Sequence, residues 1–143
     1  MSVLVTMSSK NELTVTRLSN GRRRLEKPIM FAVLKDDEDS PSGSSRKGYT
    51  IEAGFDTDYS SIPAACRALV RWSRVDMAGV VHDACYKYGG FTRKEADQIW
   101  LEVAKLGEHP ANRLQALLAY WGLRAVGLVV WKNYRKENAA WPI

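Results

Sequence analysis

One histidine, one tyrosine and two aspartates stand at spacings that suit acid–base chemistry. His82 and Tyr86 are four residues apart, so on a helix they share a face, whereas Asp83 lies about 100° round from His82. Asp97 follows in the next stretch of helical pattern, beyond a Gly-Gly break. Because two helices joined by a short glycine-containing turn pack antiparallel, we expect Asp97 to lie close to His82.

Such an arrangement is suited to activating a water molecule. A neutral histidine accepts a proton from water, while a carboxylate on its other ring nitrogen fixes the tautomer and stabilises the imidazolium. Asp97 is the expected orienting carboxylate, Tyr86 can donate a hydrogen bond to it, and Asp83 is left to bind a cation. The same residues equally fit a buried polar network with a purely structural role.

A cation at Asp83 needs further ligands, because a hard ion such as Ca²⁺ takes several oxygens. Asp56, Asp58 and the backbone carbonyls of the turn 54–61 are the candidates to complete that site. Two other chemistries fit less well. Ser60 and Ser61 lack the glycine-rich elbow of a serine nucleophile, and the two cysteines and two histidines match no paired zinc spacing.

The elements that must position these side chains fall into two blocks. Residues 1–58 have the pattern of strands and turns, except that 35–48 is acidic and then rich in Ser, Gly and Pro, which predicts a mobile loop. Residues 59–143 have helical patterns, with a capping box at Thr92 and Glu95. The expected strands cover 13–17, 22–27, 28–34 and 49–55, with a turn at 19–21, and the expected helices cover 64–72, 75–88, 93–106 and 111–136, the last bent at Gly122 or Gly127.

Strands in one block and helices in the next predict an α+β fold. We expect a small antiparallel β N-terminal part followed by a bundle of about four helices. A length of 143 residues fits a single domain over 1–143.

The charge pattern narrows the choice of partners. The formal net charge of +5 lies wholly in residues 59–143, which favours an anionic partner such as a phospholipid surface. No dense basic block or nucleic-acid fingerprint is present, which argues against nucleic-acid binding. The first residues lack the pattern of a secretory signal, so we expect none.

The apolar run 114–131 just reaches transmembrane length, but Arg124 near its middle costs about 3 kcal/mol in lipid. This argues against an integral membrane protein. It favours a core helix in which Arg124 is paired or lies at the rim.

The order of three motifs resembles a small family of phage and prophage proteins, a domain of unknown function. The segment 55–63 resembles its F-x-T-D-x-x-S-x-P signature, and H-D-x-x-Y, Arg-x-x-Ala-Asp and a tail helix with Tyr, Gly and Trp follow. The likeness covers about residues 50–131. It implies a phage or prophage origin and a place in the host cytoplasm or the virion. The matching residues are His82, Asp83, Tyr86, Arg93, Ala96, Asp97, Tyr120, Gly122 and Trp131.

The chain also resembles, more distantly, the calcium-dependent secretory-type phospholipases and their viral capsid version. That resemblance implies His82 as the base, Asp83 as a calcium ligand, Asp97 as the orienting carboxylate and Tyr86 as part of the hydrogen-bond network. The glycine-rich calcium loop and the multiple disulfides of the secreted members are absent, and residues 54–58 stand roughly where the loop should be.

Together, the two resemblances imply a phage-encoded hydrolase acting on an ester of a phospholipid or of another cell-envelope substrate. The alternative is a non-enzymatic phage virion or tail accessory protein, or one that binds a host protein, with a structural His-Asp network. The sequence leaves the oligomeric state open.

Overall fold

The structure, a computed structural model, describes residues 3–8, 15–18, 23–36, 38–57, 76–104, 113–137 and 141. Within these ranges six strands are followed by four helices, so the expected α+β fold is confirmed. The helix expected over 64–72 and the turn expected at 19–21 lie outside the described residues.

The larger sheet has three antiparallel strands in the order β1-β4-β5, which are Val3–Met7, Ile29–Asp36 and Ser44–Ile51. The apolar run in β4 suggests a strand buried on both faces, but its side chains alternate. Ile29, Phe31 and Val33 are buried, whereas Met30 and Leu34 are exposed. The sheet therefore packs on the core with one face only.

The segment 35–48 differs from the expectation of a loop. Its first residues end β4 and its last begin β5, and a turn over 38–43 joins them, with Gly43 at a φ of 78°. Lys35 pairs with Ser45 and Leu34 with Arg46 in the ladder. The prediction of a loop was wrong there because polar residues are compatible with a strand whose outer face is exposed.

A smaller antiparallel sheet has the order β2-β3-β6. Its strands are Val15–Arg17, Arg23–Leu25 and Asp56–Thr57. Arg24 and Asp56 are register partners in this sheet, and the Arg24 Nε lies 3.3 Å from the Asp56 Oδ1.

The four helices are α2 (Asp76–Tyr88), α3 (Arg93–Ala104), α4 (Arg113–Val126) and α5 (Leu128–Glu137). The predicted capping box at the start of α3 is confirmed: Thr92 N donates to Glu95 Oε1 at 2.9 Å, and Glu95 N donates to Thr92 Oγ1 at 3.1 Å. The single helix expected over 111–136 is two helices, which meet at Gly127. Among the residues described, no helix combines the length and apolar composition that a membrane crossing requires.

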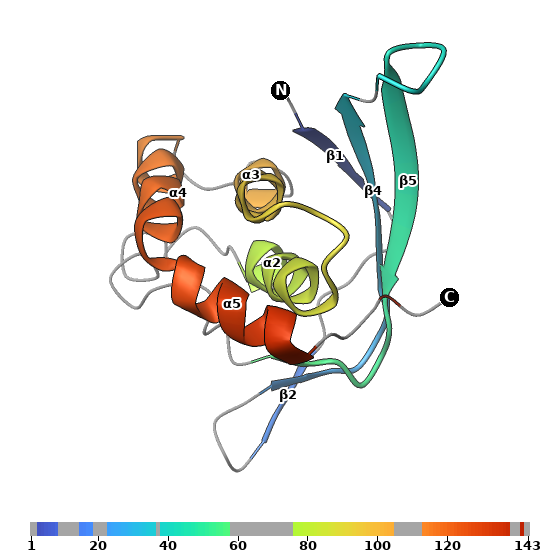
Figure 1. Cartoon of the computed structure of the whole chain (residues 1–143). Coiled ribbons are helices and arrows are strands. Elements are labelled where there is room, and N and C mark those ends of the chain that lie inside the picture. The colour runs from blue at the N-terminus through green and yellow to red at the C-terminus, as the bar shows by residue number, and fades with distance from the viewer. Residues whose placement is uncertain are drawn as a thin grey trace.

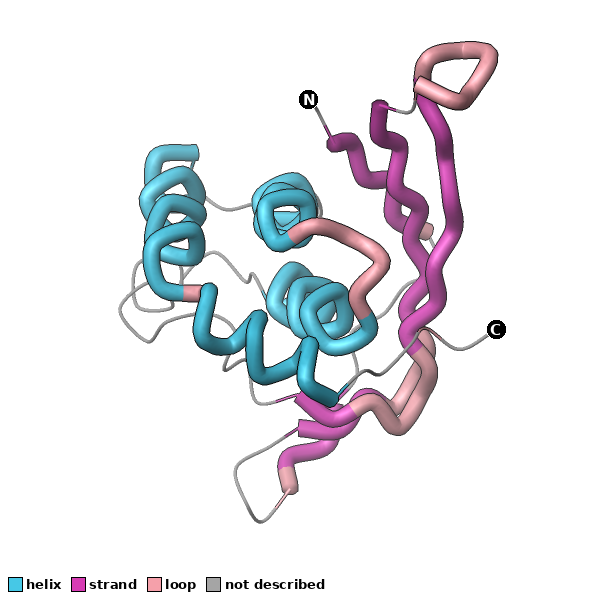
Figure 2. The backbone as a smooth tube through the Cα atoms, viewed as in Figure 1, coloured by secondary structure: helices cyan, strands magenta, loops and turns pink. Residues whose placement is uncertain are grey.

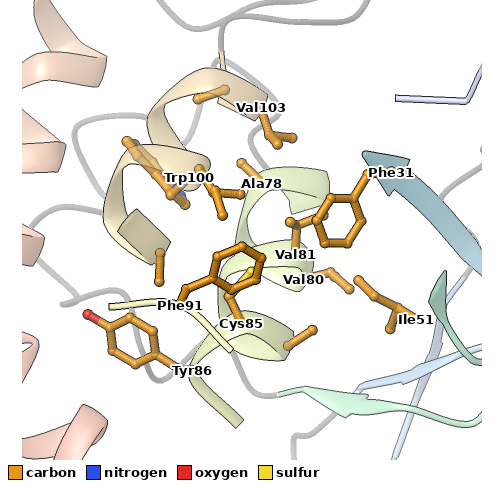
Figure 3. Close-up of a cluster of buried hydrophobic side chains, with 14 of the residues drawn as sticks. Phe31, Ile51, Ala78, Val80, Val81, Cys85, Tyr86, Phe91, Trp100 and Val103 are labelled. Atoms are coloured by element: carbon orange, nitrogen blue, oxygen red, sulfur yellow. The ribbon is translucent and has the colours of Figure 1, made fainter. Parts of the chain in front are cut away.

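The elements form three layers. Figure 1 shows the β1-β4-β5 sheet on one side, α2 and α3 beside it, and α4 and α5 on the far side of those two helices. The tube in Figure 2 shows the same separation of strands from helices. The core lies between the sheet and the middle layer, where Phe31 and Ile51 pack with Val81 and Phe91 (Figure 3). The middle helices are therefore covered on two sides, and the buried polar residues lie on them.

Candidate functional site

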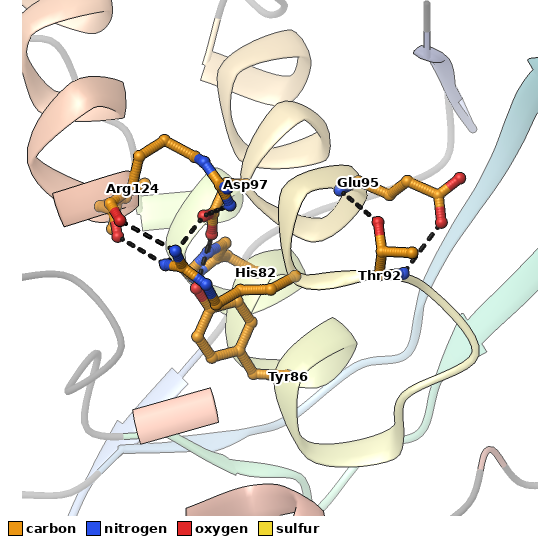
Figure 4. A network of polar contacts seen from close by, with 8 residues as sticks. His82, Tyr86, Thr92, Glu95, Asp97 and Arg124 are labelled. Atoms are coloured by element: carbon orange, nitrogen blue, oxygen red, sulfur yellow. Dashed lines mark hydrogen bonds and ion pairs between the residues drawn. The ribbon is translucent and has the colours of Figure 1, made fainter. Parts of the chain in front are cut away.

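The structure brings His82 and Asp97 together, as the helix pairing predicts. His82 Nε2 on α2 lies 2.8 Å from Asp97 Oδ1 on α3, and both side chains are fully buried (Figure 4). Because an ionised carboxylate only accepts hydrogen bonds, Nε2 carries the proton in this pair. Asp97 therefore fixes the orientation and the tautomer of the His82 ring.

Tyr86 completes this side of the carboxylate. Its hydroxyl donates to the same Asp97 Oδ1 at 2.6 Å, and the Tyr86 and His82 ring centres are 4.2 Å apart. Burial, followed by the nearby Asp97 charge, raises the pKa of the Tyr86 hydroxyl far above its usual value. Tyr86 thus stays protonated and can only donate to Asp97.

The other carboxylate oxygen faces two arginines. Arg124 Nη1 on α4 donates to Asp97 Oδ2 at 3.1 Å, and Arg93 Nη1 lies 3.6 Å from the same atom. Arg93 also donates to the backbone oxygens of Leu123 and Arg124, at 3.2 and 2.9 Å. Asp97 therefore ties together α2, α3 and α4.

The prediction that Arg124 is paired or lies at the rim is confirmed, because Arg124 is paired with Asp97. Neither Arg124 nor Arg93 is predicted from the sequence as a partner of Asp97. Two signals were available: Arg93 precedes Asp97 by four residues, the spacing of a helical ion pair, and Arg124 is the single charge in a long apolar run.

The charge state of Asp97 follows from these partners. Burial raises its pKa, but the hydrogen bonds from His82, Tyr86 and Arg124 lower it by more. The pKa of Asp97 is held below its usual value, so the side chain is a carboxylate at neutral pH.

Gly127 lets the α4–α5 junction approach this cluster. A Cβ atom there would lie 2.7 Å from both the Tyr86 hydroxyl oxygen and the Leu123 carbonyl oxygen, and 3.3 Å from Arg93 Nη1. These separations are too short for a methyl group. The sequence marked Gly127 as a possible bend but did not reveal this contact.

Asp83 and Asp56, the expected cation ligands, are placed differently from each other. Asp83 is buried on α2, whereas Asp56 on β6 pairs with Arg24, and Asp58 lies outside the described residues. A hollow of about 300 Å³ is lined by residues 52–56, which form the turn up to Asp56, and by Lys87 and Tyr88 of α2. The positive charge of the Lys87 ammonium group would repel a divalent cation in this hollow.

In the part of the chain that is described, no three His, Cys, Asp or Glu side chains gather as metal ligands. A calcium site at Asp83 would need further oxygens, such as the backbone carbonyls that also bind this ion. Cys85 is also a poor ligand, because complete burial raises the pKa of its thiol far above the usual value.

Comparison with known proteins identifies the family. Residues 37–123 match the family described as "Protein of unknown function (DUF1353)", and because this is more than half of the chain, the chain belongs to that family. The match includes the segments that carry His82, Asp97 and Tyr86 and ends within α4. No curated protein and no solved structure matches the chain. The expected kinship with a family of unknown function is confirmed.

Proposed function

We propose that this protein is a phage-encoded hydrolase in which His82 activates water for attack on an ester of a phospholipid or of another cell-envelope compound. The observation that carries the proposal is the sharing of Asp97 Oδ1 between His82 Nε2 and the Tyr86 hydroxyl. The motif likeness to calcium-dependent phospholipases supports the substrate class. The likeness to phage and prophage proteins supports the origin.

The proposed chemistry assigns one role to each side chain. Asp97 holds the His82 ring in place, and His82 takes the proton from water as the water oxygen bonds to the ester carbonyl carbon. The same proton passes to the departing alcohol when the ester bond breaks. Tyr86 and the arginines keep Asp97 in place. No step of this scheme runs through a metal ion.

The direct test is fatty-acid release from phosphatidylglycerol vesicles by the purified protein. We expect the wild-type chain to release fatty acid and His82→Asn to lose at least about a hundredfold of the rate. The matched control is His109→Asn, which changes the chain's second histidine. The proposal is wrong if the folded wild-type protein releases nothing, with or without calcium, or if His82→Asn keeps the full rate.

Calcium is tested separately, by its effect on thermal unfolding. A ligand that binds only the folded state raises the melting temperature, so Ca²⁺ bound at Asp83 would do so in the wild-type chain and not in Asp83→Asn. Equal melting temperatures with calcium and with a chelator would exclude a calcium-dependent version of the enzyme.

A second, non-enzymatic function is favoured by the complete burial of His82 and Asp97 and by the two arginines beside the carboxylate. A carboxylate already neutralised by guanidinium groups stabilises an imidazolium less well. In this case the network only joins three helices of a phage virion or tail accessory protein, or of a protein that binds a host partner.

Histidine accessibility separates the two functions. A base that activates water must be reached by small solutes, so the hydrolase predicts that diethyl pyrocarbonate modifies His82 in the folded protein at neutral pH. A purely structural network predicts modification only after denaturation. The modified residue is identified by peptide mass spectrometry, with His109→Asn as the control that leaves one histidine.

A further inference from the structure

The outer layer of the molecule exposes an apolar stripe. Leu114, Leu118 and Trp121 of α4 follow one another at intervals of four and three residues, and their exposed fractions are 66%, 49% and 65%. This spacing places them on one face of the helix. Leu128 and Val129, at the start of α5, add exposed fractions of 43% and 67%.

The opposite side of α4 already supplies its contribution to the core. Ala119, Tyr120 and Leu123 of this helix are buried and α4 contacts α3, whereas the three residues of the stripe are exposed. Figure 1 shows α4 in the outer layer of the molecule. Large apolar side chains that are exposed at helical spacing indicate an interaction site.

Basic residues continue the stripe along α5. Lys132 and Lys136 are exposed, and they follow Leu128 by one and two helical turns, so the same face changes from apolar to basic. The segment 113–137 carries five Lys or Arg residues and a single acidic residue. We call the surface formed by Leu114, Leu118, Trp121, Leu128, Val129, Lys132 and Lys136 the α4–α5 face.

We infer that the α4–α5 face docks this protein on the surface of an anionic lipid bilayer. Trp and Leu side chains on one helical face, with lysines beside them, are typical of segments that lie in the membrane interface. The tryptophan and leucines enter the boundary between headgroups and acyl chains. The lysines contact the anionic headgroups, each adding to the attraction.

Charge favours the bilayer over a second copy of the chain. A symmetric dimer through this face would oppose the same patch on both subunits, which brings the two basic ends into one interface. An anionic lipid surface instead complements Lys132 and Lys136 without a matching repulsion. The partner is therefore one that supplies negative charge and an apolar layer together.

Docking also has a consequence for the candidate active site, and this consequence rests on the proposed function. Arg124 follows Trp121 by three residues on α4 and donates to Asp97. A bilayer at Trp121 thus lies against the same helix that holds the His82–Asp97 pair. Docking itself needs no catalysis and can be tested without it.

The experiment is co-sedimentation with large vesicles of the ether-linked analogues of phosphatidylglycerol and phosphatidylcholine, which carry no carboxylic ester to hydrolyse. We expect the full chain to sediment with these vesicles and to remain in solution with pure ether-linked phosphatidylcholine. Trp121→Ala and the double variant Lys132→Glu/Lys136→Glu should each weaken binding, the double variant by about tenfold or more. The matched control is Arg46→Glu/Lys47→Glu on β5, which makes the same charge change in exposed residues of the sheet.

Three results would overturn the inference: no binding to the anionic vesicles, equal weakening by the two double variants, or unchanged binding in Trp121→Ala. Light scattering behind a gel-filtration column gives a fourth. A dimer that Trp121→Ala converts to monomer would assign the face to a second copy. If binding holds but esters are not cleaved, only the proposed hydrolase is wrong.

Discussion

At the scale of single residues, Asp97 is the residue on which the polar contacts of the site converge. It accepts hydrogen bonds from His82, Tyr86 and Arg124 and lies near Arg93, and its own side chain is fully buried. A buried carboxylate is tolerated only when its charge is compensated and its oxygens are bonded. We therefore expect the fold to depend on this residue, whatever the function of the site.

Replacing Asp97 should therefore cost more stability than replacing any one of its donors. Asp97→Asn keeps the shape but leaves Arg93 and Arg124 without their carboxylate, so we expect a loss of about 3–5 kcal/mol in the free energy of unfolding. Tyr86→Phe removes one donor to the carboxylate and should cost about 2 kcal/mol. Urea unfolding followed by circular dichroism measures both. Equal losses would mean that the arginines contribute little to holding Asp97.

The lowered pKa of Asp97 predicts a dependence of stability on pH. A carboxyl group whose pKa is lower in the folded than in the unfolded state stabilises the fold above its unfolded value, about 4, and this contribution disappears as the pH falls through the folded value. We expect wild-type stability to fall on acidification below about pH 4. Asp97→Asn should lack this part of the fall. Parallel acid-unfolding curves for the two proteins would contradict the prediction.

How much of the site was predictable depends on the distance between partners along the chain. His82, Tyr86 and Asp97 lie on two consecutive helices joined by a short turn, so helical spacing was enough to bring them together. Arg124 reaches Asp97 from 27 residues further on. The single charge in an apolar run indicated that Arg124 needs a partner, but the identity of that partner depends on how α4 packs across α3.

At the scale of elements, the break between α4 and α5 is set by packing as well as by glycine. The sequence offered two bend positions, Gly122 and Gly127. The helix continues through the first and breaks at the second, which lies against the Tyr86 hydroxyl and Arg93. Arg135 of α5 then donates to the backbone oxygens of Tyr86 and Lys87, the last turn of α2. Helix α5 thus contacts α2 at both of its ends, next to Gly127 and at Arg135.

Gly127→Ala should consequently destabilise the fold. The added methyl group meets the Leu123 carbonyl oxygen and the Tyr86 hydroxyl at 2.7 Å, and we expect a cost of about 2 kcal/mol or more. The control is Gly48→Ala on β5, where a Cβ atom meets nothing within 4 Å and the change should be close to neutral or slightly stabilising. Chemical unfolding of both variants is the measurement. If both substitutions change the free energy of unfolding by a similarly small amount, α5 can move to accept the methyl group without loss of stability.

The β elements were predicted less well than the helices, and the reason is physical. A strand on a one-sided sheet needs apolar residues only at alternate positions, and at its polar end β5 depends on the backbone ladder with β4. Its polar residues therefore indicated a loop. The helices bury wider faces, so their apolar period is easier to recognise.

At the scale of the whole molecule, Trp141 connects the sheet to the helical layers. Its ring centre lies 6.0 Å from that of Phe31 and 4.9 Å from that of Tyr49 on the sheet, and 5.0 Å from that of Tyr88 at the end of α2. Its indole Nε1 donates to the Gly89 carbonyl oxygen at 2.8 Å. Residue 141 thus closes the corner where the strands meet the α2–α3 turn.

We expect Trp141→Ala to cost about 3 kcal/mol, because it removes these ring contacts and leaves the Gly89 carbonyl without its donor. For a chain of this size the melting temperature should fall by roughly 10 °C. Trp121→Ala is the matched control: the same change at a side chain that is 65% exposed should alter stability by less than about 0.5 kcal/mol. Thermal unfolding by circular dichroism gives both values. If the two tryptophan variants have the same melting temperature, Trp141 does not stabilise the packing of the sheet on the helices. The layers are then held together by the core between the sheet and α2–α3.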